Sequence, residues 1–369
     1  MNPRQPTTDN RQPANQRRPR VLALASYPIE SASSRYRITQ FIAPLAARGI
    51  DVAFSPFLDA ALFADLYEPR RFLRRLPRLA FAMLRRLGAV FRIARADVVF
   101  VQREAMLLGP PLIEWIAARL LRRPMVLDLD DATYLHFDSP VYGRLATRLK
   151  WPGKVERLVR WSRIVICGNP NIAADVRALG ARTIVVPTVV DTRVFHPQEA
   201  ANEVPVVGWI GTHTTYPFLE RLRPVFDALA REHRFALTII GSGRAGVDAR
   251  PWRMEREADD FRSFDIGVYP LVDDGWNSRK SGLKAAQYLA SGVPFVMSPV
   301  GICASMGVPG ETHFLATTDE EWLDALRRLL TDAELRTRMG RAGRRFAETH
   351  DTIDTAADAL ADVLRDLGR

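Results

Sequence analysis

The sequence predicts an α/β protein with two open parallel sheets, each covered by helices on both faces. Short apolar runs alternate with segments of helical spacing along most of the 369 residues. With 47% hydrophobic and 25% charged residues, a chain of this length can fold as two domains. Polar and glycine-rich turns follow many of the apolar runs, as they do at the carboxyl ends of parallel strands.

Composition suggests where the domains begin and end. Residues 1–18 hold almost no apolar side chain and predict a disordered tail. The predicted first domain spans 19–190, a polar linker 191–203, the second domain 204–350 and a last helix 351–369. In the first domain, buried-type runs predict strands at 21–25, 51–54, 98–101, 125–129, 163–167 and 183–186. Helical spacing predicts helices at 112–121 and 150–161, and others that end at Gly49 and Gly180.

Residues 57–96 depart from this alternation. Nine arginines lie between Arg70 and Arg95 with no Asp or Glu among them, and Leu, Phe and Met separate them. The pattern predicts a basic amphipathic helix, kinked at Pro77. Such helices are typical of proteins that lie on anionic membrane surfaces. An ordinary helix with one face in the domain core is the alternative, and both can hold together.

The second domain continues the alternation. Strands are predicted at 204–210, 235–240, 265–269, 294–298 and 313–316, and helices at 282–290, 319–330, 332–348 and 352–367. Lys280 and Lys284 lie four residues apart, at the start of the helix 282–290 and on one face of it. Free N–H groups and a partial positive charge at a helix start favour an anion. We interpret this start as a diphosphate site; a solvated basic helix start is the alternative.

At these residues the chain resembles retaining glycosyltransferases of family 4, most specifically over 264–301 and more loosely over about 20–350. One branch of that family has the form D-I-G-x-x-P-L-x-D-D-x-W-x-x-G-K-x-G-x-K-x-x-Q-Y-M-A-x-G. This chain matches it at Asp265, Ile266, Gly267, Pro270, Leu271, Asp273, Asp274, Trp276, Lys280, Gly282, Lys284, Gln287, Tyr288, Ala290 and Gly292. Arg279 and Gln287 stand where the wider family has its Glu-x7-Glu pair. Residues 186–197 resemble the phrase between the family's two domains.

The resemblance implies a GT-B fold, with two Rossmann-like domains facing each other across a cleft and the last helix packing back on the first domain. It implies transfer of a sugar from a nucleotide-sugar to an acceptor, with retention of the anomeric configuration. A lipid-linked glycan or a cell-envelope polysaccharide precursor fits the basic helix as the acceptor. No cofactor and no metal are expected. An epimerase-like enzyme of the same fold, or a non-catalytic protein that has lost the Glu pair, stays open.

The resemblance also assigns residues. The expected catalytic groups are Lys280, Lys284, Arg35 and Asp130. The expected donor-binding residues are Gly211, Thr212, His213, Tyr269, Trp276, Ser281, Gly282, Leu283 and Gln287, with the backbone N–H groups of Gly211 and Thr212 on the phosphates. The expected acceptor-side residues are Ser34, Arg37, Arg103, Glu104 and Asp131. For Asp128–Asp131, a metal–diphosphate site and a helix N-cap are the alternatives.

Net charge and targeting signals narrow the range of expected partners and locations. A net charge of +10 favours anionic partners, but the basic run lacks a nucleic-acid-binding module, so no nucleic acid is expected. Cys167 and Cys303 match no metal spacing and suggest free thiols in a reducing compartment. No secretory signal and no membrane-spanning run are evident. We therefore expect a cytoplasmic protein, with peripheral association at the inner face of the plasma membrane through residues 70–95.

Overall fold

A computed structural model describes residues 17–66, 69–135, 149–198, 202–244 and 246–368. Most of the predicted tail and residues 199–201 of the predicted linker lie outside these ranges. The first domain holds a six-stranded parallel sheet in the order β2-β1-β3-β4-β5-β6. Its strands are β1 (Arg20–Ala25), β2 (Asp51–Pro56), β3 (Val98–Gln102), β4 (Met125–Leu129), β5 (Ile164–Cys167) and β6 (Thr183–Val185).

The second domain holds a five-stranded parallel sheet in the order β11-β10-β9-β7-β8. Its strands are β7 (Val206–Ile210), β8 (Ala236–Ile240), β9 (Ile266–Tyr269), β10 (Phe295–Met297) and β11 (His313–Leu315). In both sheets the strand order reverses beside the first strand, between β1 and β3 and between β7 and β9. Crevices at such reversals bind ligands in open parallel sheets. The prediction of two doubly wound α/β domains is confirmed.

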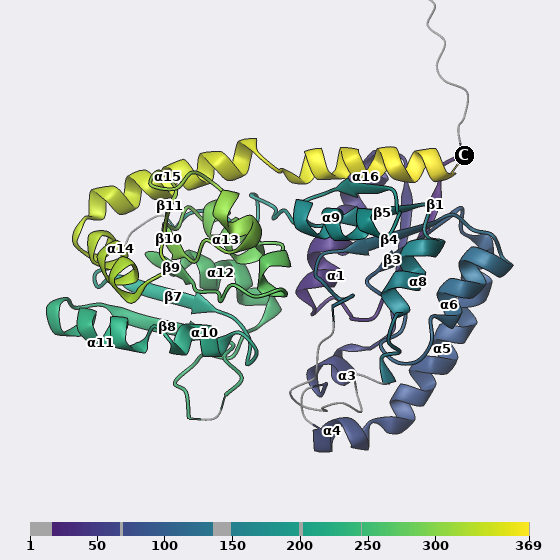
Figure 1. Cartoon of the computed structure of the whole chain (residues 1–369), viewed down its shortest axis with the longest axis horizontal. Helices are drawn as coiled ribbons and strands as arrows, with labels where there is room; N and C mark the ends of the chain where they lie inside the picture. The colour runs from purple at the N-terminus through teal and green to yellow at the C-terminus, as the bar shows by residue number, and fades with distance from the viewer. Residues whose placement is uncertain (1–16, 67–68, 136–148, 199–201, 245, 369) are drawn as a thin grey trace, which may run out of the picture.

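Helices cover both faces of each sheet (Figure 1). Those of the first domain are α1 (Ala32–Arg37), α2 (Ile42–Ala47), α3 (Ala60–Ala64), α4 (Pro69–Arg74), α5 (Leu76–Arg95), α6 (Leu112–Trp115), α8 (Lys154–Trp161) and α9 (Pro170–Ala178). Those that follow are α10 (Tyr216–Glu220), α11 (Arg223–Glu232), α12 (Glu257–Arg262), α13 (Leu283–Ala290), α14 (Asp319–Thr331), α15 (Ala333–Thr349) and α16 (Ile353–Gly368). Short helical turns are η1 (Thr39–Phe41), η2 (Ile116–Leu120), η3 (Met254–Arg256), η4 (Asn277–Arg279) and η5 (Gly301–Ser305).

The last two helices run end to end across both domains (Figure 1). Helix α15 packs on α13 of the second domain, where Gly340 lies so close to the Gly292 carbonyl that no Cβ fits. Helix α16 packs on the first domain, and Ile353, Leu360 and Leu364 join the apolar cluster beneath β1. The chain therefore crosses between the domains a second time after the segment that joins β6 to β7.

The arginine-rich residues 70–95 form two helices, α4 and α5, and not one long helix. Helix α4 ends at Arg74, and α5 begins at Leu76. Pro77 lies in the first turn of α5, where its missing N–H costs nothing, so it starts a helix and does not kink one. Among helices in the described ranges, none is long and apolar enough to cross a bilayer.

Candidate active site

A cavity of about 730 Å³ lies between the two domains, at the loops that follow the strand-order reversals. It is lined by most of the residues that the sequence singled out. They are Arg35, Arg103, Asp130 and Asp131 from the first domain and Gly211, Thr212, His213, Tyr269, Lys280, Ser281, Gly282, Leu283, Lys284 and Gln287 from the second. Residues more than 200 positions apart in the chain therefore meet in one place.

A second cavity of about 720 Å³ adjoins the first. The two share lining residues from both domains, namely Tyr27, Arg103, Asp131, Thr214, Thr215 and Lys280. Trp276, expected to bind the donor, lines this second cavity and not the first. Glu104 lines it too, and its carboxylate accepts a 2.8 Å hydrogen bond from the Lys154 ammonium.

Lysine is rare in this chain and is confined to these cavities. Of 52 basic residues, only four are lysines, at positions 150, 154, 280 and 284. Lys150 and Lys154 line the second cavity, Lys284 the first and Lys280 both. A lysine ammonium is a compact charge whose pKa shifts on burial, unlike that of an arginine. Every compact cation of the chain thus faces the space between the domains.

The start of α13 forms one wall of the first cavity. Gly282 caps it in the left-handed region, with φ of 69°, and a Cβ there would collide with the Met306 sulfur. No side chain caps the first turn, so its N–H groups stay available to a ligand. Burial, and then the positive charge of Lys280, lowers the pKa of Lys284 to about 8. Neither lysine forms an ion pair with a described carboxylate, which leaves an unneutralised cationic wall.

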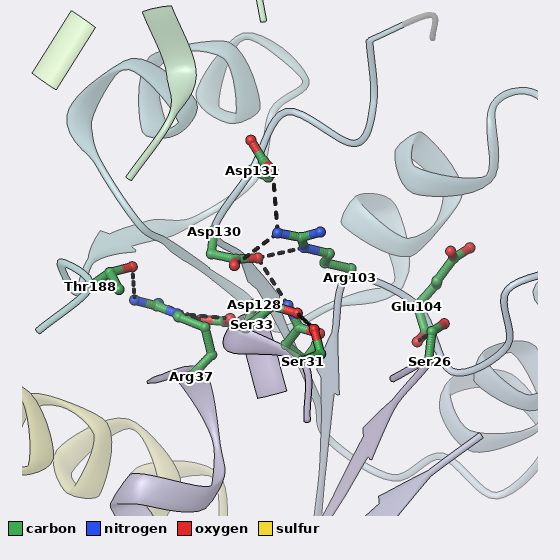
Figure 2. Close-up of polar contacts among 11 residues, drawn as sticks. Ser26, Ser31, Ser33, Arg37, Arg103, Glu104, Asp128, Asp130, Asp131 and Thr188 are labelled. Atoms are coloured by element: carbon green, nitrogen blue, oxygen red, sulfur yellow. Dashed lines mark hydrogen bonds and ion pairs between the residues drawn. The ribbon is translucent and has the colours of Figure 1, made fainter. Parts of the chain in front are cut away.

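The acidic cluster forms the opposite wall, and Figure 2 shows Arg103 at its centre. Arg103 follows β3 with a left-handed φ of 59°, an uncommon conformation for a side chain of this size. Its guanidinium donates to Asp130 at 2.6 and 2.9 Å, and Gln102 donates to Asp130 at 2.9 Å. Burial alone would raise the pKa of Asp130, but Arg103 outweighs it and holds that pKa below its usual value. Asp130 is therefore saturated by protein donors.

Asp131 differs from its neighbour. Its Oδ2 accepts one long hydrogen bond, of 3.4 Å, from Arg103. Its Oδ1 is buried and accepts no hydrogen bond from the residues that the structure describes. Burial raises the pKa of Asp131 in spite of Arg103 and Lys280. Since Asp131 lines both cavities, it is the carboxylate of this cluster that is best placed to meet a ligand.

Two expected acceptor-side residues lie below the cavities and line neither. Arg37 is 3% exposed, and its guanidinium donates to Asp128 at 2.5–3.2 Å and to the Val186 carbonyl at 2.8 Å. Ser34 is fully buried, and its hydroxyl donates to the Tyr27 carbonyl at 2.8 Å. The expectation of direct acceptor contact is therefore corrected for both residues. Their side chains form buried hydrogen bonds within the first domain, and these bonds fix the loop after β1.

The glycine turn after β7 also differs from expectation. The Gly211 N–H donates to the Ile240 carbonyl at 3.0 Å, and the Thr212 N–H donates to the Thr215 hydroxyl at 3.1 Å. These two N–H groups are therefore occupied by the turn itself and are not available to phosphates. Glycine is still required, because a Cβ at Gly211 would collide with the Trp209 ring. The turn brings the His213 side chain to the cavity.

Arg35 lines the first cavity but already has a partner in the other domain. It donates to Glu257 at 2.9 Å and stacks over the Trp252 ring at 5.1 Å. The Tyr36 hydroxyl donates to the same Glu257 oxygen at 2.8 Å and accepts from Gln287 at 3.0 Å. Tyr36, Trp252 and Glu257 were not among the predicted site residues, since no motif marks the segment that holds the last two.

The loop before α13 is held by the first domain. Arg279 donates to Asp175 of α9 at 2.5 Å, and Asn169 donates to the carbonyls of Arg279 and Lys280. The guanidinium of Arg279, at the family's first Glu position, is thus engaged by the other domain. These contacts fix Lys280 at the junction of the two cavities.

Comparison with known proteins supports the fold and points to a function. Residues 204–332 match the model of the family described as glycosyl transferases group 1. No curated protein sequence matches the chain. HepE of Anabaena, solved in complex with UDP, superposes with a TM-score of 0.67 at 16% identity, over 94% of this chain and 100% of HepE. Sucrose-phosphate synthase of Thermosynechococcus elongatus gives 0.67 at 14% identity, over 95% and 99%. The chain has the GT-B fold.

Proposed function

We propose that this protein transfers a sugar from a nucleoside-diphosphate sugar to an acceptor, with retention of configuration. The observation that carries the proposal is the meeting of Lys280, Lys284 and the start of α13 in one cavity, opposite Asp131. Two ammonium groups and free helix N–H donors suit a diphosphate. The family match of residues 204–332, and the UDP bound to HepE, support a nucleotide-sugar as the donor.

The arrangement suits the chemistry of transfer. As the bond between the anomeric carbon and the diphosphate oxygen breaks, negative charge grows on the leaving group, and Lys280 and Lys284 stabilise it. The acceptor oxygen bonds to the anomeric carbon on the same face, and its proton passes to the departing diphosphate. Asp131 orients the acceptor hydroxyl and stabilises the positive charge that develops on the sugar. Closure of the two domains excludes water.

The second cavity is the proposed acceptor site. It adjoins the first cavity, the proposed donor cavity, at Lys280 and Asp131. Five aromatic side chains line it, namely Tyr27, Tyr134, Trp151, Phe218 and Trp276. Aromatic faces present rigid apolar surface beside polar groups, which suits sugar rings. A glycan acceptor, lipid-linked or a polysaccharide precursor, fits this lining.

The proposal is tested by binding and then by product analysis. A thermal-shift screen of nucleoside diphosphates and nucleotide-sugars should find one that raises Tm, since a ligand at 100 times its Kd stabilises by about 2.7 kcal/mol. Transfer from that donor to glycan acceptors is then followed, and proton NMR of the first product reports its anomeric configuration. If no nucleotide stabilises the chain, the proposed function fails. An inverted product would overturn retention alone.

Nucleotide affinity should depend on pH through Lys284. With a pKa of about 8, this lysine is charged below pH 8 in the free protein and neutral above it. The Kd for a nucleoside diphosphate should therefore be nearly constant from pH 7 to 7.5 and weaken toward about tenfold per unit above pH 8, as binding takes up one proton. Calorimetry in buffers of different ionisation enthalpy measures both the Kd and the number of protons taken up on binding. Lys284→Met should remove the dependence; an unchanged profile in that variant would contradict the assignment.

We expect activity without a divalent metal. In the Asp128–Asp131 cluster, Arg37 binds Asp128 and Arg103 binds Asp130, so arginines occupy the carboxylates that a metal would need. Turnover after exhaustive chelation should stay within about twofold of the untreated enzyme. Loss of turnover that Mn²⁺ or Mg²⁺ restores would place a metal in the reaction.

We also propose that α5 binds an anionic membrane. Its core face holds Leu79, Arg86 and Ile93, and Arg86 is buried with its guanidinium on the carbonyls of β1 and β2. The opposite face exposes Phe81, Leu84 and Phe91 at 66%, 66% and 72%. Helix α6 and the turn after it lie beside α5 (Figure 1) and add exposed Trp115 and Leu120. Exposed apolar side chains beside arginines suit the headgroup boundary of an anionic bilayer.

The structure shows which arginines of residues 70–95 are exposed and unpaired, and can therefore contact a membrane. Arg86 faces the core, and Arg75 pairs with Asp65 at 3.1 Å, so the expectation of nine unpaired arginines is wrong. Arg71, Arg74 and Arg78 are exposed and have no carboxylate partner among the described residues. Helix α3 comes just before this segment in the chain. A bilayer at α5 would thus lie near α3, whose Phe63 and Ala64 line the first cavity.

Vesicle co-sedimentation tests this surface. The protein should bind vesicles with 30% anionic phospholipid at low salt and be released as salt rises. Replacing Arg71, Arg74 and Arg78 by Gln should weaken binding by at least about tenfold. The matched control replaces three exposed arginines of α15, Arg338, Arg341 and Arg345, and should bind normally. If both triple variants bound vesicles equally weakly, the loss would come from the lower net charge alone. That result would contradict a specific membrane-binding face at α4 and α5.

A further inference from the structure

The second domain lacks a carboxylate at both positions where the family carries its Glu pair. Arg279 binds Asp175 of the first domain, and the amide of Gln287 donates to the Tyr36 hydroxyl. A nucleotide-sugar presents hydroxyl groups, and a carboxylate oxygen, with its two lone pairs, is a strong acceptor for them. The structure therefore raises the question of which carboxylate takes this place.

Glu257, the first residue of α12, lines the donor cavity. Among the described residues that line it, the other acids are Glu30, Asp130 and Asp131, all from the first domain. Glu257 is thus the acid that the nucleotide-binding domain supplies. Gly241, Gly243 and Trp252 of the same domain also line this cavity.

The two oxygens of Glu257 have different surroundings. Oε2 accepts from Arg35 at 2.9 Å and from Tyr36 at 2.8 Å, which fixes the carboxylate in one orientation. Oε1 accepts no hydrogen bond from the residues that the structure describes, and Glu257 is 9% exposed, at the cavity wall. One oxygen is therefore held in place by the protein while the other stays available to a ligand hydroxyl.

A carboxylate near a diphosphate would normally repel it, because both groups are negatively charged. Arg35 pairs with Glu257, and the side chains of both are almost fully buried, at 13% and 12% exposed. The pair is neutral overall, so it does not repel the phosphates that Lys280 and Lys284 attract. Tyr36 joins Glu257 to Gln287, one turn along α13 from Leu283 at the helix start. The Tyr36 hydroxyl therefore links the carboxylate to Gln287, which stands at the position of the family's second Glu.

We propose that Glu257 accepts hydrogen bonds from the ribose hydroxyls of the donor nucleotide and replaces the missing Glu pair. This inference rests on the proposed function. Trp252, whose ring stacks on Arg35 and lines the same cavity, offers an aromatic face for the nucleoside. Tyr36 and Arg35 of the first domain hold Glu257 in its orientation, so ribose recognition depends on the contact between the two domains.

The test compares ribose with deoxyribose. The probes are the nucleoside diphosphate that stabilises the wild-type chain most and its 2′-deoxy and 3′-deoxy counterparts, with Kd measured by calorimetry. We expect the wild type to prefer the ribonucleotide by about tenfold or more, because hydrogen bonds to a charged acceptor are strong. Glu257→Gln keeps an oxygen for Arg35 and Tyr36 but places an NH₂ group at Oε1, and Glu257→Ala removes both oxygens. In both variants the preference should fall below about threefold.

The control is Glu255→Gln, an exposed carboxylate two residues away, which should keep the full preference. A wild type that binds ribo- and deoxynucleotides equally would overturn the inference, and so would a preference that survives in both Glu257 variants. If instead no nucleotide binds the wild type, the proposed function itself fails, which is a different result.

Discussion

Lys284→Ala should lower kcat by about 10²- to 10³-fold, as expected when one preorganised contact to a developing charge is lost. Lys284 lines the first cavity at the start of α13, where burial and then the positive charge of Lys280 lower its pKa to about 8. A diphosphate that enters supplies a counter-charge. The measurement is steady-state transfer at saturating donor, with the donor KM determined in parallel.

The effects of side-chain volume and of charge at position 284 must be separated. Lys284→Met keeps the side-chain volume and removes the charge, so its loss of kcat should equal that of Lys284→Ala. Arg338→Ala, an exposed arginine of α15, removes a positive charge outside both cavities and should leave kcat unchanged. Near-normal turnover of both Lys284 variants would overturn the diphosphate assignment. A loss in the alanine variant alone would point to packing and not to charge.

Asp131→Asn should lower kcat by about 10²- to 10³-fold while the Kd for the nucleoside diphosphate stays within about threefold. The carboxylate lines both cavities and has an unbonded Oδ1, so we expect its charge to act on the sugar and on the acceptor hydroxyl and not on nucleotide binding. Asparagine preserves the shape and removes the charge. Single-turnover kinetics with donor prebound separate the chemical step from binding.

Two further variants decide between the neighbouring acids. Asp130→Asn should mainly lower Tm, because Asp130 holds the strained Arg103 in place with two hydrogen bonds. Asp273→Asn, an exposed acid outside both cavities, is the control for charge. If Asp130→Asn abolished transfer in a folded protein while Asp131→Asn was neutral, the sequence-based choice of Asp130 would be right and the present one wrong.

Local sequence determined the two parallel sheets and the start of α13. A buried parallel strand needs a short continuous apolar run, and the turn after it needs polar or glycine residues, so both can be predicted from the chain alone. The capping Gly282, with Lys280 and Lys284 four residues apart, is likewise a local pattern, because helix geometry fixes which residues share a face. These features needed no knowledge of distant partners.

The tertiary structure decided which charged residues are free to act. Arg35, Arg37 and Asp130 carry the right chemistry in sequence, but Glu257, Asp128 and Arg103 respectively pair with them. The partner of Arg35 lies 222 residues away, and that of Arg37 lies 91 residues away. Burial makes it costly to break such a pair or to leave a charge unpaired, so availability for a ligand depends on long-range contacts that local spacing does not encode.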